Sequence, residues 1–419
     1  MTTKDPSETT VVVGAGIIGI ACAHYLSQAG FQVTVIDRGR IGGACSHANC
    51  GYICPSHVLP LTEPATLLAG LKSLFNPNAP FRIKPQPSPM LWKWMWQFAR
   101  RCNHRQMIQA GTALKTILDS SMIEYRDLMT NEDLDCQWKD KGLLYVLRTQ
   151  RGIDEFSKTD QLLTERFGVR ATRIEADALP QVDAALKPGL AGAFHYESDA
   201  SVKPDVLIKR WTEQLKQRGV RFVEHCEVFD FVRSSGGIKQ LKTSSGEMSA
   251  DHFVVATGAW SPKLSRQLRC NIPIQPGKGY SVTMTRPTPC PTYPMLFPEH
   301  KVGVTPFESS YRLGSMMEFS GYDASIPARR IDQLRRSAEP YVVTPHTDGT
   351  LETWYGWRPM TWDSLPIIGP VPKLDNTYLA TGHNMLGLSL ATATGKLISE
   401  MVSGQATHVD AAPFSPTRF

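Results

Sequence analysis

The sequence predicts an α/β fold that opens with a Rossmann-like βαβ unit, and three observations near the N-terminus predict it. Residues 10–13 (TVVV) form a continuous β-branched run, which is typical of a strand buried on both faces. The pattern GAGIIG follows at 14–19, and residues 17–28 are predicted to form a helix that ends before Gly30. Residues 31–36 (FQVTVI) then predict a second strand, with Asp37 at its end.

This arrangement is the dinucleotide-binding fingerprint in its full context. Gly14 allows the tight turn, Gly16 lets the backbone approach a pyrophosphate, and Gly19 lets the helix pack close to the strand. The helix N-terminus offers free N–H groups to phosphate. Asp37 is positioned to accept hydrogen bonds from a ribose hydroxyl, which favours FAD or NAD over NADP. The alternative, a glycine-rich turn in another α/β protein, does not account for strand, helix, second strand and acid in register.

The chain contains one such fingerprint. Neither Gly236-Gly237 nor the GKG at 277–279 fits the pattern. A flavin reductase that takes electrons from NAD(P)H commonly needs a second dinucleotide fold. If the single site holds FAD, the substrate itself is therefore expected to be the reductant.

The composition predicts an ordinary globular chain of two or three domains. The 419 residues are 42% hydrophobic and 20% charged, which excludes a mostly disordered protein. The net charge of +6 is small for a nucleic-acid binder, but it suits anionic substrates, phosphate cofactors or an anionic membrane surface.

A cytoplasmic location is expected from two features. The longest apolar stretch, 11–23, contains three glycines and is shorter than the roughly 18–20 residues that span a bilayer. Residues 1–10 are polar and lack the apolar core of a signal peptide. The nine cysteines are accordingly expected to be reduced thiols.

Later segments return to the nucleotide-binding unit. A helix is predicted at 206–218, and strands are predicted at 220–223, 227–232 and 252–256, the last followed by Thr257 and Gly258. Near the C-terminus, a strand at 378–380 leads through a glycine-rich turn into a final helix at 389–399. A helix that begins after such a turn makes a second anion site, which is expected to face the flavin.

Together these motifs resemble the D-amino-acid oxidase superfamily of FAD enzymes, over nearly the whole chain. The resemblance is strongest to bacterial D-amino-acid dehydrogenases of the small-subunit type, and the chain end also resembles glyphosate oxidoreductase and hydroxyproline dehydrogenases. It is carried by VVVGAGIIG with DR at 37–38, SHANCG at 46–51, WKWMW at 92–96, KGYS at 278–281, WYGWRPMT at 354–361, TGH at 381–383 and PFSPTRF at 413–419.

The resemblance implies two domains. A discontinuous FAD-binding domain is expected at 1–65, 196–265 and 350–419. A substrate domain of α+β type, built on an antiparallel sheet, is expected at 66–195 and 266–349. Strand-like runs at 142–147, 192–196, 279–284, 303–306 and 311–316 agree with that sheet.

The resemblance also implies site residues. Arg358 is expected to bind the substrate carboxylate, since a planar guanidinium forms two charge-assisted hydrogen bonds with it. The alternative is a structural pair with Asp363 or another acid. Tyr280 and Tyr52 are candidates for a further bond to substrate, or for half-buried core aromatics. The residues implied for cofactor binding are Gly14, Gly16, Ile17, Ile18, Gly19, Asp37, Arg38, Ser46, His47, Asn49, Cys50, Gly51, Val228, Thr257, Gly258, Gly382, His383, Met385, Leu386, Gly387 and Leu388.

The implied reaction is oxidative deamination, with hydride transfer from the substrate Cα to flavin N5 and hydrolysis of the imine to a 2-oxo acid and ammonia. No general base is nominated. FAD is expected to be non-covalent, because no cysteine follows residue 330. Cys45, Cys50 and Cys54 lack the paired spacing of a metal site and are interpreted as small packing residues, so no metal is expected.

Residues 59–105 are predicted to form a lid or a membrane-facing insertion. Trp92, Trp94 and Trp96 lie beside several basic residues, a combination that suits a membrane interface. Three tryptophans spaced two apart cannot share one helical face, so at least one should be exposed. The resemblance to the dehydrogenases implies peripheral association with the inner membrane and a quinone or respiratory acceptor. The alternative is a helix that packs its aromatic side chains over the substrate domain.

Two other functions stay open at this stage. One is an oxygen-using oxidase or dehydrogenase of secondary amines such as glycine, sarcosine, glyphosate or hydroxy-D-proline. The other is a non-enzymatic flavoprotein subunit, which the retention of Arg358 disfavours. The amino acid itself and its chirality are not visible in the sequence.

Overall fold

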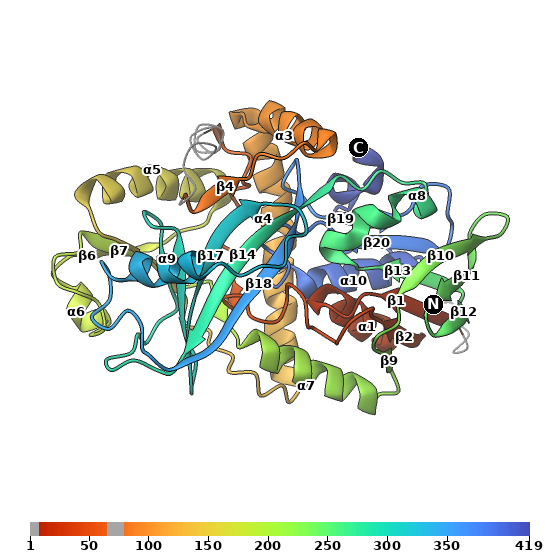
Figure 1. Cartoon of the computed structure of the whole chain (residues 1–419), viewed down its shortest axis with the longest axis horizontal. Helices are drawn as coiled ribbons and strands as arrows, with labels where there is room; N and C mark the ends of the chain where they lie inside the picture. The colour runs from red at the N-terminus through yellow and green to blue at the C-terminus, as the bar shows by residue number, and fades with distance from the viewer. Residues whose placement is uncertain (1–7, 65–78) are drawn as a thin grey trace.

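A six-stranded, mostly parallel sheet forms one half of the molecule. The computed structural model describes residues 8–64 and 79–419, and Figure 1 shows this sheet on the right. Its strands lie in the order β19-β20-β13-β1-β2-β9, and only β19 runs antiparallel to its neighbour. The bounds are β1 Thr9–Val13, β2 Gln32–Ile36, β9 Arg221–Val223, β13 His252–Val255, β19 Ile367–Pro370 and β20 Thr377–Thr381.

The two faces of this sheet are covered differently. Val12 of β1 points into a core shared with five helices, which are α1 (Ile17–Gln28), α4 (His104–Asn131), α5 (Gln150–Phe167), α7 (Pro204–Gln217) and α10 (Ala391–Val402). Val11 and Val13 point the other way, into a core with a small antiparallel sheet. That sheet consists of β10 (Val228–Arg233), β11 (Ile238–Thr243) and β12 (Gly246–Ser249).

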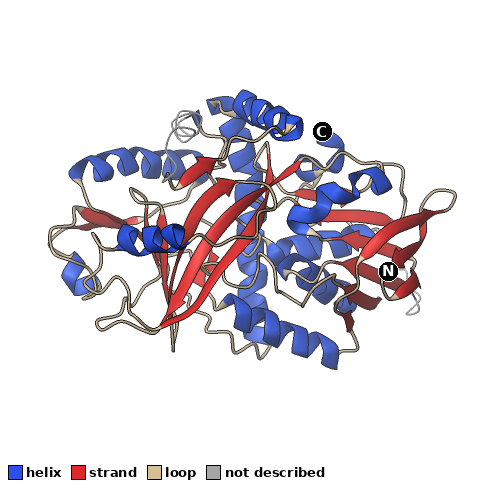
Figure 2. Cartoon of the chain, viewed as in Figure 1, coloured by secondary structure: helices blue, strands red, loops and turns tan. Residues whose placement is uncertain are grey.

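A second, nine-stranded sheet forms the other half and crosses the left and centre of Figure 2. Eight strands lie in the order β18-β14-β17-β16-β15-β5-β7-β6, and β4 pairs with β17 beside this path. Its pairings are antiparallel except for β15 with β5 and β17 with β4. The bounds are β4 Phe81–Ile83, β5 Leu143–Leu147, β6 Thr172–Glu175, β7 Gly192–Tyr196, β14 Ile274–Met284, β15 Met295–Phe297, β16 Val302–Pro306, β17 Tyr311–Phe319 and β18 Thr350–Thr361.

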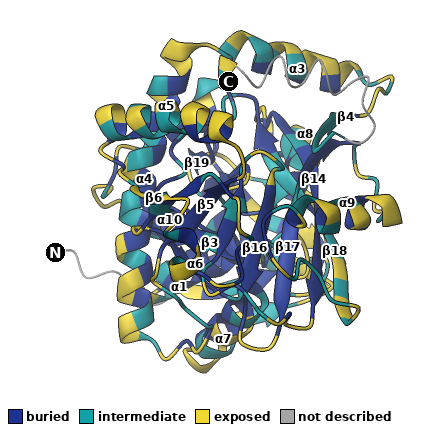
Figure 3. Cartoon of the chain, turned by 90° about the vertical axis from the view of Figure 1, so that its left-hand side faces the viewer, coloured by how far each residue is buried: buried dark blue, intermediate teal, exposed yellow. Residues whose placement is uncertain are grey.

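Shorter elements connect the two halves. The pair β3 and β8 joins Tyr52–Ile53 to Ala200–Ser201. The remaining helices are α3 Pro89–Arg101, α6 Leu179–Val182, α8 Ser265–Leu268 and α9 Ala328–Ala338, and short 3-10 turns lie at Gly258–Leu264, Ala412–Phe414 and Pro416–Arg418. Figure 3 shows that the strands of the long sheet are mostly buried, whereas α3 at the top carries many exposed residues.

The sequence predictions of the first βαβ unit are confirmed, since α1 has the predicted bounds and β1 and β2 differ by a single residue. The strands predicted for the second sheet are also present, and the α/β fold with a second, mostly antiparallel sheet is as predicted. Residues 1–7, and the part of the 59–105 insertion that falls on 65–78, lie outside the described residues.

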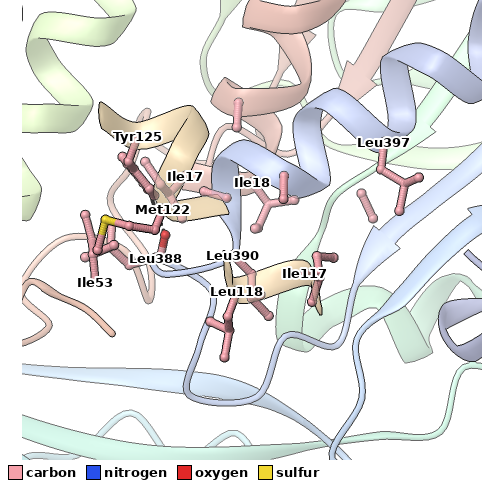
Figure 4. Packing of buried hydrophobic residues seen from close by; sticks show 14 of the residues in the cluster. Ile17, Ile18, Ile53, Ile117, Leu118, Met122, Tyr125, Leu388, Leu390 and Leu397 are labelled. Atoms are coloured by element: carbon pink, nitrogen blue, oxygen red, sulfur yellow. Dashed lines mark hydrogen bonds between the residues drawn. The ribbon is translucent and has the colours of Figure 1, made fainter. Parts of the chain in front are cut away.

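Two predicted boundaries disagree with the packing. A boundary at 350 would separate β18 from β14, but the two strands are paired along their whole length, and β18 completes the edge of the nine-stranded sheet. The segment 66–195 contains α4, yet α4 packs on α10 beside the six-stranded sheet. Ser121 and Thr392 join the two helices through a 2.7 Å hydroxyl–hydroxyl hydrogen bond. Figure 4 shows Ile117, Leu118 and Met122 beside Leu388 and Leu390.

Candidate active site

A continuous cavity of about 1170 Å³ runs between the two sheets. It begins at the glycine-rich turn after β1, passes the loop between β20 and α10, and reaches the inner face of β14, β16, β17 and β18. Of the residues predicted for the site, all line this cavity except Gly19, His47 and Gly382. The structure therefore brings together segments that are hundreds of residues apart in the sequence.

The glycine-rich turn has the geometry that its sequence predicts. Gly14 has φ of +111°, and a Cβ there would lie 2.5 Å from the carbonyl oxygen of Ala256. A Cβ on Gly19 would lie 1.8 Å from the carbonyl oxygen of Gly14, so Gly19 serves helix packing and does not face the cavity. Gly16 is the N-cap residue of α1 and has no side chain that could bond to the helix N-terminus. Ser46 Oγ accepts a hydrogen bond from the Ile17 N–H at 3.1 Å.

Asp37 is held firmly at the end of β2. Its two carboxylate oxygens accept hydrogen bonds from the backbone N–H groups of Ala15 and Gly39, each at 2.7 Å. Each oxygen keeps a further lone pair for a ligand hydroxyl. Beside it, the Arg38 guanidinium stacks 4.2 Å from the Trp260 ring centre, and both side chains line the cavity wall.

The loop between β20 and α10 presents its backbone to the cavity. His383 is buried, and its Nε2 forms a 3.0 Å hydrogen bond with Thr394 Oγ1 of α10. Burial lowers the pKa of His383 to about 3, so the ring is neutral. Tyr125 of α4 donates a 2.7 Å hydrogen bond to the carbonyl of Leu388, which holds this loop against the helix. Figure 4 shows Tyr125 and Leu388 side by side.

Arg358 lies in the cavity wall without a carboxylate partner. Its Nη1 donates a hydrogen bond to the carbonyl of Met316, and within residues 8–64 and 79–419 it forms no ion pair. The alternative pairing with Asp363 does not occur, because Asp363 binds Arg418 Nε at 2.8 Å. Burial lowers the pKa of Arg358, but a guanidinium stays protonated in proteins. The site thus holds a positive charge that an anionic ligand can neutralise.

Gly279 is a site residue that the sequence interpretation missed. A Cβ at this position would lie 2.4–2.5 Å from Nη1, Cζ and Nη2 of Arg358, so the guanidinium rests directly on the glycine backbone of β14. A glycine inside a strand weakens the strand and often marks a close approach of another group. That signal was present in the KGYS motif at 278–281.

The two predicted tyrosines use their hydroxyl groups within the protein. Tyr280 is buried and donates a 3.0 Å hydrogen bond to Glu318, whose carboxylate also pairs with Arg82 at 3.0 Å and Arg330 at 3.4 Å. Tyr52 donates to the carbonyls of Met295 at 2.8 Å and Val304 at 3.0 Å. Both rings line the cavity, but these hydroxyls are oriented by protein partners.

Besides Gly19, two predicted cofactor residues, His47 and Gly382, do not line the cavity. His47 points away, and its Nε2 lies 2.7 Å from Glu352 Oε1. Gly382 has φ of +73°, which suits glycine in the turn after β20. The imidazole of His47 is satisfied by the acid on β18, a partner that the sequence pattern does not reveal.

The cysteines are free thiols. Cys45 and Cys50 line the cavity, and burial raises the pKa of Cys45 to about 11 and also raises that of Cys50. In the described part of the chain, no group of three or more His, Cys, Asp or Glu side chains is arranged to hold a metal ion. None of the helices described is long and apolar enough to cross a membrane.

The fold and this cavity define a dinucleotide-dependent oxidoreductase with an anion-binding site near the cofactor. Comparison with known proteins agrees: residues 9–401 match the family described as FAD dependent oxidoreductase. The chain belongs to this family, and FAD is its cofactor.

Two curated relatives are similar over nearly their whole length. One is a D-amino acid dehydrogenase of Vibrio atlanticus, 32% identical over 98% of this chain and 99% of the relative. The other is a D-amino acid dehydrogenase of Agrobacterium fabrum, 29% identical over 97% and 99%.

Solved structures share the fold. Glycine oxidase from Geobacillus kaustophilus superimposes with a TM-score of 0.77 and 22% identity over 99% of this chain and 100% of that one. L-proline dehydrogenase from P. horikoshii superimposes with a TM-score of 0.72 and 19% identity over 99% and 98%.

The cavity residues fit FAD. The turn at Gly16, the fixed carboxylate of Asp37 and the exposed backbone of the loop before α10 supply donors and acceptors for a dinucleotide along one continuous channel. FAD bound there supplies the redox chemistry. The residue-by-residue assignment of cofactor contacts and the non-covalent attachment remain predictions.

Proposed function

We propose that the protein catalyses the oxidative deamination of D-amino acids, giving a 2-oxo acid and ammonia. The observation that carries this proposal is the Arg358 guanidinium, which faces the cavity without an acidic partner among the described residues. The full-length similarity to D-amino acid dehydrogenases supports the substrate class.

The residues of the chain act mainly by positioning. Arg358 binds the substrate carboxylate through two N–H donors, which fixes both the position and the orientation of the Cα–H bond. Gly279 sets where the guanidinium lies, and the Met316 carbonyl holds it from behind. FAD, when bound, would supply the acceptor for the hydride that leaves Cα. No side chain is required as a base when the amine is neutral, and the imine product hydrolyses in water.

The test is anaerobic mixing of the holoenzyme with single amino acids while flavin absorbance is followed. We expect D-alanine and other D-amino acids to bleach the flavin, and L-alanine to leave it oxidised. Bleaching only by glycine, sarcosine or cis-4-hydroxy-D-proline would replace the proposal with a secondary-amine enzyme. Readmission of air and measurement of peroxide then separates an oxidase from a dehydrogenase.

We also propose that electrons pass to a membrane quinone and that α3 contacts the membrane surface. Trp92 and Trp96 are 44% and 56% exposed, whereas Trp94 between them is buried at 3%. The prediction that the three tryptophans cannot share a face is thus confirmed. Arg100 stacks 4.7 Å from the Trp96 ring centre, and α3 carries no acidic residue. An exposed aromatic stripe with basic neighbours suits an anionic lipid interface.

Vesicle sedimentation tests this contact. The holoenzyme should sediment with phosphatidylglycerol vesicles and less with phosphatidylcholine vesicles, and W92S/W96S should reduce sedimentation at least fivefold. Exposed Ile123 of α4, changed to Ser, is the control. Equal sedimentation of the double variant and the wild type would contradict the proposal.

A further inference from the structure

The cavity has an apolar branch on the far side of Tyr52 from Arg358. Its walls come from the segment after β3, from α4 and α5, and from β5 and β15. The apolar side chains that line it include Leu59, Leu114, Tyr145, Phe156, Leu163 and Leu296. The deamination chemistry proposed above does not use this branch.

The strand order gives the distance between the branch and the arginine. The Arg358 guanidinium lies on Gly279 of β14, and Tyr145 lies on β5. Between them the sheet runs β14-β17-β16-β15-β5, which is four interstrand steps of about 4.8 Å, or about 19 Å. The nearer wall, at Leu296 of β15, is three steps or about 14 Å from β14. An amino acid as large as phenylalanine spans less than about 10 Å from carboxylate to ring tip at ordinary bond lengths. A substrate held by Arg358 therefore cannot fill the branch.

The segment 50–52 separates the two compartments. A Cβ on Gly314 of β17 would lie 2.7 Å from Cys50 Sγ, and a Cβ on Gly303 of β16 would lie 2.8 Å from the Tyr52 hydroxyl. These two side chains thus rest on the middle strands of the sheet, between β14 and β5. The two compartments belong to one continuous cavity. A ligand in the branch would therefore be separated from Arg358 by Cys50 and Tyr52 but would still lie in the same cavity.

Resting on the proposed function, we propose that the apolar branch binds the ring of a quinone, the electron acceptor, at a place separate from the amino-acid site. A quinone ring is planar and apolar and carries two carbonyl oxygens that need donors. The branch offers apolar walls together with the side chains of Ser56, His57 and Thr159. Within residues 8–64 and 79–419, no hydrogen bond engages the His57 ring, so its N–H is free to donate.

A proton source also adjoins the branch. Two electrons and one proton leave the reduced cofactor, one proton comes from the protein, and the quinone becomes a quinol while the cofactor returns to its oxidised state. Ser56 Oγ lies 2.6 Å from the buried carboxyl of Asp199, with Cys54, Tyr145 and Tyr196 as its titratable neighbours. Burial raises the pKa of Asp199 to about 7, so the carboxyl carries a proton for a substantial part of the time at neutral pH.

The position of the branch agrees with a lipid-borne ligand. Figures 1 and 3 place α5, which lines the branch, and α3, which carries the exposed tryptophans, along the upper side of the molecule. A quinone delivered at the surface of α3 would approach the cavity from that side.

The test uses Thr159→Trp, which fills the branch, and Lys158→Trp as a matched control on the exposed side of α5. Holoenzyme variants are assayed with decylubiquinone, with ferricyanide, and in the anaerobic reduction by D-alanine alone. We expect T159W to lower kcat/KM for decylubiquinone at least tenfold, while its flavin reduction by D-alanine stays within twofold of wild type. K158W should stay within twofold of wild type in both measurements. Equal quinone turnover in all three proteins, or a loss of D-alanine reduction in T159W, would overturn the proposal.

A binding measurement on the wild-type holoenzyme tests the same inference without the variant. A redox-inactive quinone analogue is titrated by calorimetry with and without a saturating amino-acid-like carboxylate. We expect the analogue to bind equally in both cases, because the sites are separate. Mutually exclusive binding, or no binding, refutes a separate quinone site. The outcome of D-alanine reduction judges the proposed deamination independently.

Discussion

Gly279→Ala is the substitution that most directly tests the arginine site. The added Cβ would lie 2.4–2.5 Å from three atoms of the Arg358 guanidinium, and ordinary contact begins at 3.4 Å. The guanidinium must therefore move by about 1 Å. It is the end of a flexible side chain, so the sheet itself can stay in place. A misplacement of about 1 Å costs up to about 100-fold in a positioned reaction, or about 2.7 kcal/mol.

The assay compares carboxylate binding, flavin reduction and stability in two variants. Gly277→Ala is the control, because its Cβ would press on Met317 Sδ at 2.5 Å and Met360 Cγ at 2.7 Å, two residues away on the same strand. Overpacking costs typically about 1–3 kcal/mol, so both variants should lower the thermal midpoint. Only G279A should weaken benzoate binding and slow reduction by D-alanine, by 10- to 100-fold. Wild-type benzoate affinity in G279A, or equal losses in both variants, would refute the reasoning.

Three further predictions follow from the same contacts. Arg358→Lys keeps the positive charge but loses the two parallel N–H donors of the guanidinium. Carboxylate affinity, measured by flavin absorbance, should therefore fall about 10- to 100-fold, at about 1.5–3 kcal/mol per charged hydrogen bond. The control Arg418→Lys, which changes the pair with Asp363, should leave this affinity unchanged. Tyr52→Phe removes the donor to two backbone carbonyls and should cost about 1–3 kcal/mol of unfolding free energy, with flavin reduction within twofold; a larger kinetic loss would give the hydroxyl a role toward substrate. Burial raises the pKa of Asp199 from 3.8 to about 7, so the native state favours the protonated carboxyl, and the stability this gives at low pH is lost as pH rises from about 4 to about 7. Asp199→Asn should therefore match wild type in urea unfolding at pH 4 and exceed it at pH 8 by up to about 4 kcal/mol, whereas a constant difference at all pH values would contradict the assignment.

Local sequence signals predicted the parts of the molecule whose geometry is local. The turn at 14–19, α1 and the end of β2 follow from glycine conformation and apolar runs, and their positions agree with the structure. The strands of the second sheet were equally visible as short β-branched and aromatic runs. Their pairing was not visible, because register depends on contacts between strands that are distant in the chain.

The partners of side chains were the part that the sequence could not supply. His47 pairs with Glu352, 305 positions away, and Asp363 pairs with Arg418 and not with Arg358. Likewise, the hydroxyl of Tyr52 is taken up by β15 and β16. Each of these contacts decides whether a residue faces the ligand or the protein. A motif names the residue but contains nothing about the partner.

The glycines of the long sheet connect its fold to its function. Glycine weakens a strand, so its recurrence in four adjacent strands, β18, β14, β17 and β16, needs a reason. Gly279 carries the Arg358 guanidinium, Gly356 faces the Trp354 ring, Gly314 faces Cys50, and Gly303 faces Tyr52. Gly279 is paired with Gly356, and Gly314 is paired with Gly303. Ser281, two residues along β14 from Gly279, pairs with Gly314 and links the two pairs. All four glycines therefore lie on the same face of the sheet. Because these four residues have no side chains, the cavity extends down to the backbone of the sheet. The Cys50 and Tyr52 side chains that contact this backbone divide the cavity into the arginine compartment and the apolar branch.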